Sequence, residues 1–265
     1  MPFFEYQGKK MHYVDLDQRK DTSAGMPLVF VHGAGSSLMI WTLQLLEFRK
    51  THRVIALDLY GHGDSEDIGH PPDIEKGFTG QIATLMDHLD IEEFVLAGHS
   101  MGGGVVMSYA LRDDVRQPSA LILVGTSSDL DLSKIGIGLV IESLEDHTPK
   151  YDIEEISADF KTFSLANFQE NVTKFHPATI LNDLRACHEF DVTARLSEIE
   201  IPSFVMVGED DDIITPHVAN RLDEALPRSD IAVVKGGDHS PMVESPEPFN
   251  HLLRKFVNWV EKNKN

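Results

Sequence analysis

Short apolar runs alternate with amphipathic stretches along most of the chain. Continuous apolar runs suit parallel strands that are buried on both faces, because helices then cover each side of the sheet. The runs that fit this description lie at 27–31, 53–58, 94–97, 120–124, 203–207 and 230–234, and residues 10–17 alternate as in a half-exposed strand. The pattern therefore predicts a mainly parallel sheet with helices on both faces.

Amphipathic stretches between these runs predict the covering helices at 79–89, 101–111, 216–226 and 246–262. The last two begin at Pro216 and Pro246, and proline suits the first helical turn, where its missing N–H has no partner. Residues 128–192 contain amphipathic segments but no clear central strand, so they predict a helical insertion, either as packing helices or as a cap over a pocket. The expected organisation is one core of residues 1–127 and 193–265 with a helical cap at 128–192.

Charge is the one feature of the composition that changes this picture. Acidic residues outnumber basic ones 43 to 23 among 265 residues, which gives a net charge of −20 with neutral histidines. A field of that sign repels phosphate backbones and anionic lipid surfaces, so neither nucleic acid nor a membrane is expected as a partner. No run approaches the ~18–20 apolar residues of a membrane helix, and the first residues lack the order of a secretory signal. A cytoplasmic monomer or homodimer is expected.

The single cysteine, Cys187, limits the chemistry that the chain can carry. It cannot form an internal disulfide and cannot supply a cysteine-rich metal site. We expect it to pack as a small apolar residue.

The segment Gly-His-Ser-Met-Gly at 98–102 fits the pattern Gly-x-Ser-x-Gly and lies between a predicted strand and a predicted helix. A nucleophile elbow requires this context, because the glycines permit a sharp turn that leaves the serine hydroxyl exposed. The N-terminus of the following helix favours negative charge that develops there. Ser100 is therefore the candidate nucleophile.

Serine needs a general base, and the base needs an orienting acid. After an elbow of this kind the acid and the histidine follow in that order, each behind a later strand. Of the 13 histidines, His239 alone occupies the expected position, behind the run at 230–234. His99 flanks Ser100, but strand–helix geometry predicts that it points away from the nucleophile and serves packing.

The candidate acid lies in a run of three aspartates, Asp210, Asp211 and Asp212, behind the strand at 203–207. Counting forward from the strand end favours Asp211, whereas counting back from Pro216 favours Asp212. We take Asp211 as the candidate acid and leave Asp212 as the alternative.

An oxyanion hole needs two backbone donors aimed at the carbonyl oxygen of the tetrahedral intermediate. One is expected to be the N–H of Met101, the residue after the nucleophile. The other is expected from the small-residue loop His-Gly-Ala-Gly-Ser at 32–36, with Ala34 as the candidate donor.

Five ordered motifs, at 32–33, 58–65, 98–103, 208–211 and 237–239, together resemble the α/β-hydrolase superfamily over nearly the whole chain. The resemblance implies an α/β-hydrolase fold, with a mostly parallel eight-stranded sheet flanked by helices. It also implies that the insertion at 128–192 is a cap that shapes the substrate pocket. It gives the motif at 58–65 a structural role beside the floor of the site.

The residues of the elbow limit which groups of the superfamily the chain resembles. A serine nucleophile disfavours haloalkane dehalogenases and epoxide hydrolases, whose elbow carries aspartate, and the histidine before Ser100 differs from the usual asparagine of carbon–carbon bond hydrolases. The chain is similar to the carboxylesterase, enol-lactonase and perhydrolase group, for which no cofactor or metal is expected. We expect it to cleave small to medium uncharged carboxylic esters. Lactone or carbon–carbon bond hydrolysis, and a ligand receptor with vestigial hydrolysis, are the alternatives.

Apolar side chains near the expected pocket are candidates for lining it, although packing in the core is the commoner role of such residues. They are Leu139, Phe160, Phe163, Phe168 and Met242.

Overall fold

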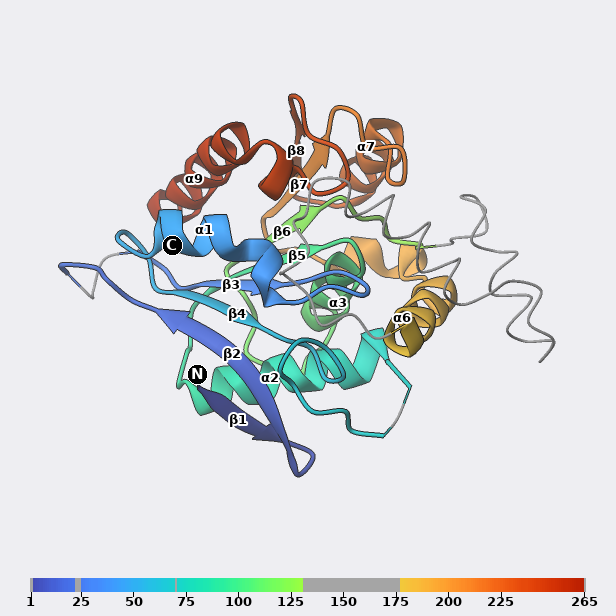
Figure 1. Cartoon of the computed structure of the whole chain (residues 1–265). Helices are drawn as coiled ribbons and strands as arrows, with labels where there is room; N and C mark the ends of the chain where they lie inside the picture. Colours follow the sequence, from blue (N-terminus) through green and yellow to red (C-terminus); the bar gives the residue numbers. More distant parts are fainter. Residues whose placement is uncertain (1, 22–24, 70, 131–176, 265) are drawn as a thin grey trace.

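The computed structural model describes residues 2–21, 25–69, 71–130 and 177–264 (Figure 1). Its strands form one eight-stranded sheet in the order β1-β2-β4-β3-β5-β6-β7-β8. The strands are β1 (Phe3–Tyr6), β2 (Lys9–Leu16), β3 (Leu28–Val31), β4 (Val54–Leu57), β5 (Val95–His99), β6 (Ala120–Val124), β7 (Ser203–Gly208) and β8 (Ser229–Val234). Only the pairs β1–β2 and β2–β4 are antiparallel, so the expected mostly parallel sheet is confirmed.

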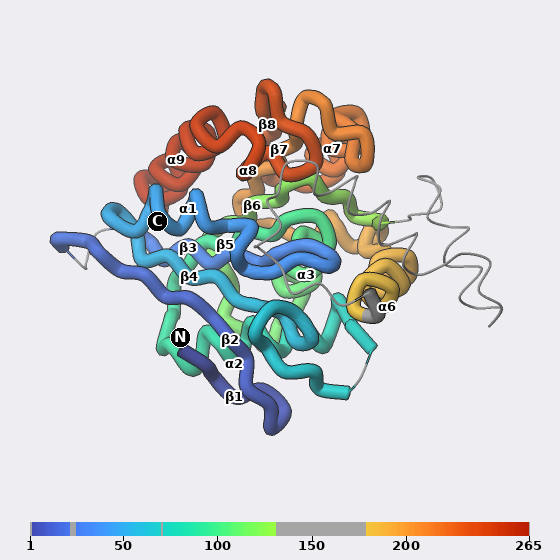
Figure 2. Tube along the Cα trace, viewed as in Figure 1, coloured from blue at the N-terminus to red at the C-terminus, as the bar shows by residue number. Residues whose placement is uncertain are grey.

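Helices cover both faces of this sheet, and the path of the chain between them can be followed in Figure 2. The side chains of α2 (Thr79–His88), α3 (Met101–Ala110) and α7 (Pro216–Ala225) pack in one hydrophobic cluster, and those of α1 (Thr42–Phe48), α8 (Pro241–Glu244) and α9 (Pro246–Lys262) in another. Shorter helical segments are η1 (Leu38–Trp41), η2 (Ile74–Phe78) and η4 (Thr193–Glu198), and α6 (Pro177–Glu189) lies beside α3. Among the described residues, no helix is long and apolar enough to cross a bilayer.

Alternate side chains of the central strands enter the two clusters, as the period of a strand requires. In β3, Val29 and Val31 pack on the α2 and α3 side, whereas Leu28 and Phe30 pack on the α1 and α9 side. All four are at most 1% exposed, which explains why the sequence shows an unbroken apolar run here rather than an alternating one.

The short helical segments η1, η2, η4 and α8 were not predicted from the sequence pattern, and neither were strand β1 and helix α1. Strand β1 pairs only with β2 at the edge of the sheet, and it leaves Phe3 44% exposed. Helix α1 is short and carries Leu43 and Leu46 on its exposed side, so its apolar residues do not form a single stripe. The local sequence of β1 and of α1 gives only a weak signal for a strand or a helix, and both elements depend on tertiary packing for their stability.

The parallel core brings the predicted site residues to one end of the sheet, because parallel strands present their carboxyl ends at the same edge. The loop at 32–36 follows β3, Ser100 follows β5, Asp211 follows β7 and His239 follows β8. The expected cap boundaries at 128 and 192 cannot be compared in full, because residues 131–176 lie outside the described part of the chain.

Candidate active site

Ser100 occupies a tight turn between β5 and α3, with φ 53° and ψ −119°. This φ lies in the left-handed region, which is rare for residues other than glycine and is found at functional sites. The turn leaves no room for side chains on either side. A Cβ at Gly98 would come within 2.1 Å of the Gly102 carbonyl oxygen, and one at Gly102 would lie 2.5 Å from that of His32. The two glycines of the motif are thus steric requirements of the elbow.

Hydrogen bonds fix the backbone of Ser100 on both sides. Its N–H donates to the Val124 carbonyl oxygen at 2.9 Å, and its own carbonyl oxygen accepts from Thr126 Oγ1 at 2.9 Å. Ser100 is partly exposed, whereas the side chains of His99 and Met101 beside it are buried. The elbow therefore leaves the Ser100 side chain accessible to solvent and buries the side chains of the residues on either side of it.

His239 and Asp211 meet behind the ends of β8 and β7. His239 Nδ1 lies 3.0 Å from Asp211 Oδ2 and 3.2 Å from Oδ1. An ionised carboxylate only accepts hydrogen bonds, so Nδ1 carries the proton and Nε2 of the neutral ring is left as the acceptor. The Asp211 side chain is fully buried, and its Oδ1 also accepts from the N–H groups of Ile213 and Ile214. These contacts hold the carboxylate in one orientation.

The structure brings Asp211, and not Asp212, to His239. Asp212 is exposed, and no contact between it and the imidazole is found among the described residues. The neighbouring Asp210 is exposed as well. The sequence left Asp211 and Asp212 open as the acid, and the geometry favours Asp211, the residue reached by counting forward from the end of the strand.

His99 has a contact that the sequence did not predict. We expected a packing residue directed away from the site, and it is indeed buried, but its Nε2 lies 2.9 Å from the backbone carbonyl oxygen of His239. Because the carbonyl only accepts, Nε2 donates and His99 ties the elbow to the histidine loop. The partner lies 140 residues later in the chain, so no local signal could have indicated the bond.

Burial, together with the nearby His239, lowers the pKa of His99 from 6.5 to about 3. In the unfolded chain the same group titrates near 6.5. Between these values the unfolded state binds the additional proton, so His99 reduces stability as the pH falls below 6.5 and has no such effect above it.

A His99→Gln variant tests this pH dependence, because its amide can donate the same hydrogen bond and does not titrate. The difference in unfolding free energy between parent and variant is expected to shift in favour of the variant by up to about 1.4 kcal/mol for each pH unit below 6.5. Denaturant unfolding at several pH values measures it. A difference independent of pH would show that the folded protein protonates His99 readily.

The expected oxyanion donors lie next to the elbow. Met101 is the first residue of α3, where a backbone N–H has no partner within the helix. The loop at 32–36 approaches from the other side, since a Cβ at Gly33 would lie 3.1 Å from Ser100 Cβ. Ala34 in this loop is half-buried. Both candidate donors therefore lie in segments that border Ser100.

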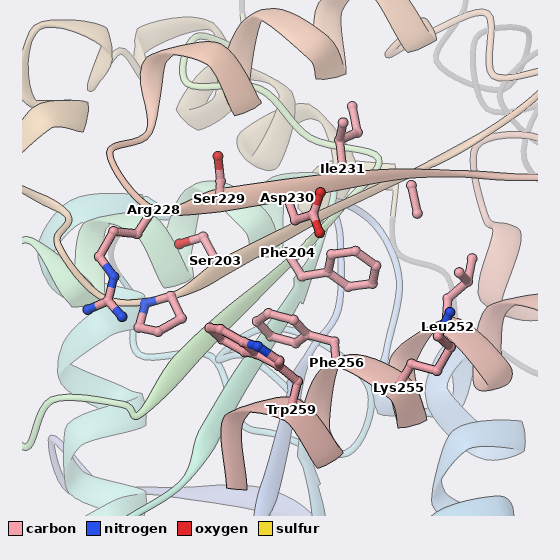
Figure 3. A pocket seen from close by; sticks show the side chains of 12 residues that line it. Ser203, Phe204, Arg228, Ser229, Asp230, Ile231, Leu252, Lys255, Phe256 and Trp259 are labelled. Carbon is pink, nitrogen blue, oxygen red and sulfur yellow. The ribbon is translucent and has the colours of Figure 1, made fainter. Parts of the chain in front are cut away.

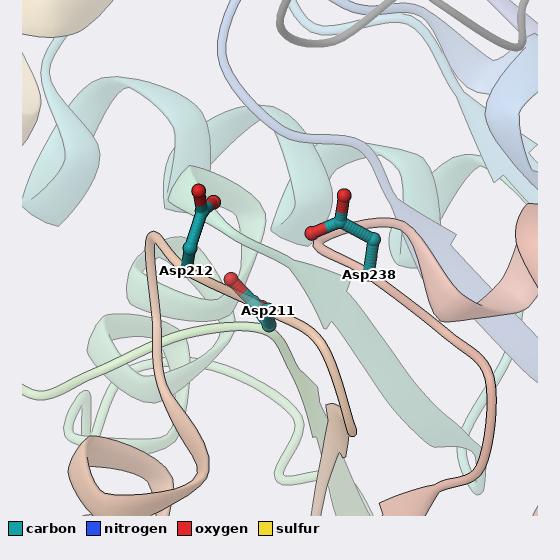
Figure 4. Close-up of side chains that lie close together, drawn as sticks. All are labelled: Asp211, Asp212 and Asp238. Atoms are coloured by element: carbon teal, nitrogen blue, oxygen red, sulfur yellow. The ribbon is translucent and has the colours of Figure 1, made fainter.

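Asp211, Asp212 and Asp238 bring carboxylate oxygens within 4.8 Å of one another (Figure 4). Asp211 is already bonded to His239, and Asp238 Oδ1 accepts from the His239 N–H at 2.7 Å. The cluster thus joins the loop after β7, which carries Asp211 and Asp212, to the loop after β8, which carries Asp238 and His239.

A separate groove of about 740 Å³ lies at the β8 edge of the sheet (Figure 3). Phe256 stacks on Phe204 there, with ring centroids 4.9 Å apart, and Trp259 follows on the same side of α9. The groove is lined by the amino ends of β7 and β8, whereas Asp211 and His239 follow their carboxyl ends. It does not belong to the candidate site.

Most of the proposed pocket residues cannot be placed. Leu139, Phe160, Phe163 and Phe168 lie outside the described residues. Met242 is fully buried in the cluster under α1 and α9, so it is a core residue.

Cys187 is buried, as expected, and burial, with the nearby Asp183 carboxylate, raises the pKa of its thiol.

Comparisons with known proteins concern the family and the fold of the chain. The model of the alpha/beta hydrolase family matches residues 28–252. A non-heme haloperoxidase from Rhodococcus erythropolis is 26% identical over 261 residues, which cover 90% of this chain and 94% of that protein. The solved structure of a thermophilic esterase from Thermogutta terrifontis has a TM-score of 0.78 at 25% identity and covers 95% of this chain and 94% of its own. Est816, described as an N-acyl homoserine lactone degrading enzyme, has a TM-score of 0.75 at 25% identity, with 96% and 100% covered.

Proposed function

Because the chain belongs to the alpha/beta hydrolase family, we propose that it is a serine hydrolase that cleaves carboxylic esters of small to medium, uncharged substrates through an acyl-enzyme. The observation that carries the proposal is the bond from His239 Nδ1 to the buried Asp211 carboxylate beside the Ser100 elbow. That bond leaves Nε2 unprotonated, as a general base must be.

Acylation begins when His239 Nε2 removes the proton of the Ser100 hydroxyl, whose oxygen attacks the ester carbonyl carbon. The carbonyl oxygen becomes negative, and the N–H groups of Met101 and Ala34 stabilise it. The ester C–O bond then breaks, and the imidazolium gives its proton to the departing alcohol. Asp211 holds the ring in the required tautomer and stabilises its charge throughout.

Deacylation repeats these steps with water. His239 takes a proton from a water molecule, whose oxygen attacks the acyl carbon. The bond to Ser100 Oγ breaks, Ser100 regains its proton from His239, and the carboxylic acid leaves. No redox partner or cofactor is needed to balance this cycle.

Lactone hydrolysis is the second candidate, favoured by the similarity to a lactone-degrading enzyme over nearly the whole chain. A lactone is a cyclic ester, so the same residues would act, and only the shape of the pocket would differ. The two reactions therefore share Ser100 and differ in substrate preference.

A panel of p-nitrophenyl esters of graded chain length, assayed beside N-acyl homoserine lactones, tests the proposal. We expect turnover of the shorter esters, with kcat/KM falling for anionic acyl groups because the protein carries a net charge of −20. Higher kcat/KM on the lactones would move the assignment to a lactonase. Stoichiometric binding of these compounds without turnover would support a receptor.

A further inference from the structure

Helix α6 contacts two loops of the core through one face. Thr179 Oγ1 donates to the Gly61 carbonyl oxygen at 3.3 Å, and Ile180 packs against Gly35, where an added Cβ would lie 2.7 Å from Ile180 Cγ1. One turn later, Asp183 reaches both loops. Residue 183 lies on the same face as residues 179 and 180, because it follows them by four and three positions, which is about one helical turn.

The Asp183 carboxylate is fully buried, and one of its oxygens accepts two hydrogen bonds. Asp183 Oδ2 lies 2.7 Å from the backbone nitrogen of Gly35 and 2.7 Å from His62 Nε2. The other oxygen has no partner among the described residues. The contacts of this buried carboxylate therefore converge on a single backbone amide and a single imidazole.

Both ring nitrogens of His62 face oxygen atoms, an arrangement that suits a ring with a proton on each nitrogen beside an ionised Asp183. His62 Nδ1 lies 3.0 Å from the Tyr60 carbonyl oxygen and Nε2 faces the Asp183 carboxylate, and neither partner can donate. Burial alone lowers the pKa of His62, but the charge and hydrogen bond of Asp183, with the Tyr60 carbonyl, outweigh it and raise the pKa overall. Asp183 and His62 thus form a buried hydrogen-bonded pair that is arranged to hold opposite charges.

Such a pair is a poor way to gain stability. Removing two charges from water costs several kcal/mol for each ion, and replacing a buried pair with apolar residues is often neutral or stabilising. What an apolar pair cannot do is accept the Gly35 N–H. That bond explains why a hydrogen-bond acceptor, rather than an apolar residue, stands at this position.

Gly35 belongs to the loop that borders the nucleophile. Its φ of +60° and its contact with Ile180 fix the path of the loop, and Gly33 lies against Ser100. Holding the Gly35 N–H fixes the plane of the peptide that joins Ala34 to Gly35. That constraint limits rotation at Ala34, the candidate oxyanion donor.

We propose that Asp183 is a positioning residue for the oxyanion-hole loop, which holds the Gly35 N–H and so keeps the Ala34 N–H directed at the developing oxyanion. The inference rests on the proposed function, in which Ala34 donates to that oxygen. Because the oxyanion exists only in the transition state, loss of the constraint lowers kcat and leaves KM nearly unchanged.

The test uses three variants of the full chain. His62→Phe/Asp183→Leu removes the ionisable pair and the acceptor for Gly35 and replaces them with apolar side chains of similar shape and somewhat larger volume. Asp183→Asn keeps an acceptor oxygen, and Arg185→Gln changes an exposed residue of the same helix as a control. We expect the double variant to remain folded, with a lower melting temperature because the Gly35 N–H and the Tyr60 carbonyl lose their partners. Its kcat is expected to fall by about 10-fold to 100-fold, with KM changed less than about 3-fold. The kcat of Asp183→Asn is expected to lie close to that of the parent, because the amide oxygen can still accept from Gly35. The kcat of Arg185→Gln is expected to equal that of the parent.

Hydrogen exchange at the Gly35 amide, resolved by ¹⁵N NMR, tests the bond without reference to turnover. We expect slow exchange in the parent and in Asp183→Asn, and faster exchange in the double variant. Fast exchange in the parent, or a folded double variant with parental kcat, would overturn the inference. Retention of turnover by Ser100→Ala would instead overturn the proposed function, and Gly35 exchange would still report on the bond.

Discussion

Ser100→Ala is expected to lower kcat for a p-nitrophenyl ester by about 10⁴-fold to 10⁶-fold, because it removes the proposed nucleophile of the acyl-enzyme. The substitution removes one oxygen from a partly exposed side chain, so the free energy of unfolding should change by less than about 0.5 kcal/mol. Steady-state assays and denaturant unfolding of the same preparations measure both quantities.

His239→Ala provides the matching control. Ser100 and His239 act as one unit, so the double variant should be scarcely slower than either single variant. A fluorophosphonate should label the parent at Ser100 in a one-to-one ratio, with the adduct located by mass spectrometry of the digest. Near-parental turnover by folded Ser100→Ala, or an adduct at another residue, would remove Ser100 from the mechanism.

Asp211→Asn is expected to lower kcat by as much as about 10⁴-fold, as the equivalent change does in a serine protease with a Ser-His-Asp triad. An amide can donate to Nδ1, which favours the tautomer that carries its proton on Nε2 and cannot act as a base. Asp211 Oδ1 also accepts from two backbone N–H groups, and the amide oxygen of asparagine can keep those bonds, so the loop should stay folded.

Asp212→Asn is the matched control for that prediction, because it makes the same chemical change one residue away on an exposed side chain. It should retain kcat within about 3-fold, since an exposed charge near the site has only a small, screened effect. Rate measurements at low and high salt separate that screened effect from a loss of geometry. The reverse ranking of the two variants would transfer the role of the acid to Asp212.

The local sequence was sufficient for those features that depend on short-range chemistry. Central strands such as β3 and β6 were predicted because both of their faces are buried, which makes every residue apolar. The elbow was predicted because a turn as tight as that at Ser100 admits only glycine at 98 and 102. The order of the acid and the histidine along the chain was also predictable, because each lies in the loop that follows a later parallel strand.

Tertiary structure decided the contacts between segments far apart in the chain. The three consecutive aspartates are chemically identical, and only the position of the His239 loop singles out Asp211. The bond from His99 to the backbone of His239 spans 140 residues, and that from the Gly35 N–H to Asp183 spans 148. Local propensity and periodicity describe a residue and its neighbours within a turn or a strand, whereas these partners are set by how helices and loops pack. The sequence therefore determined the type of site, and the packing decided which side chains hold it in place.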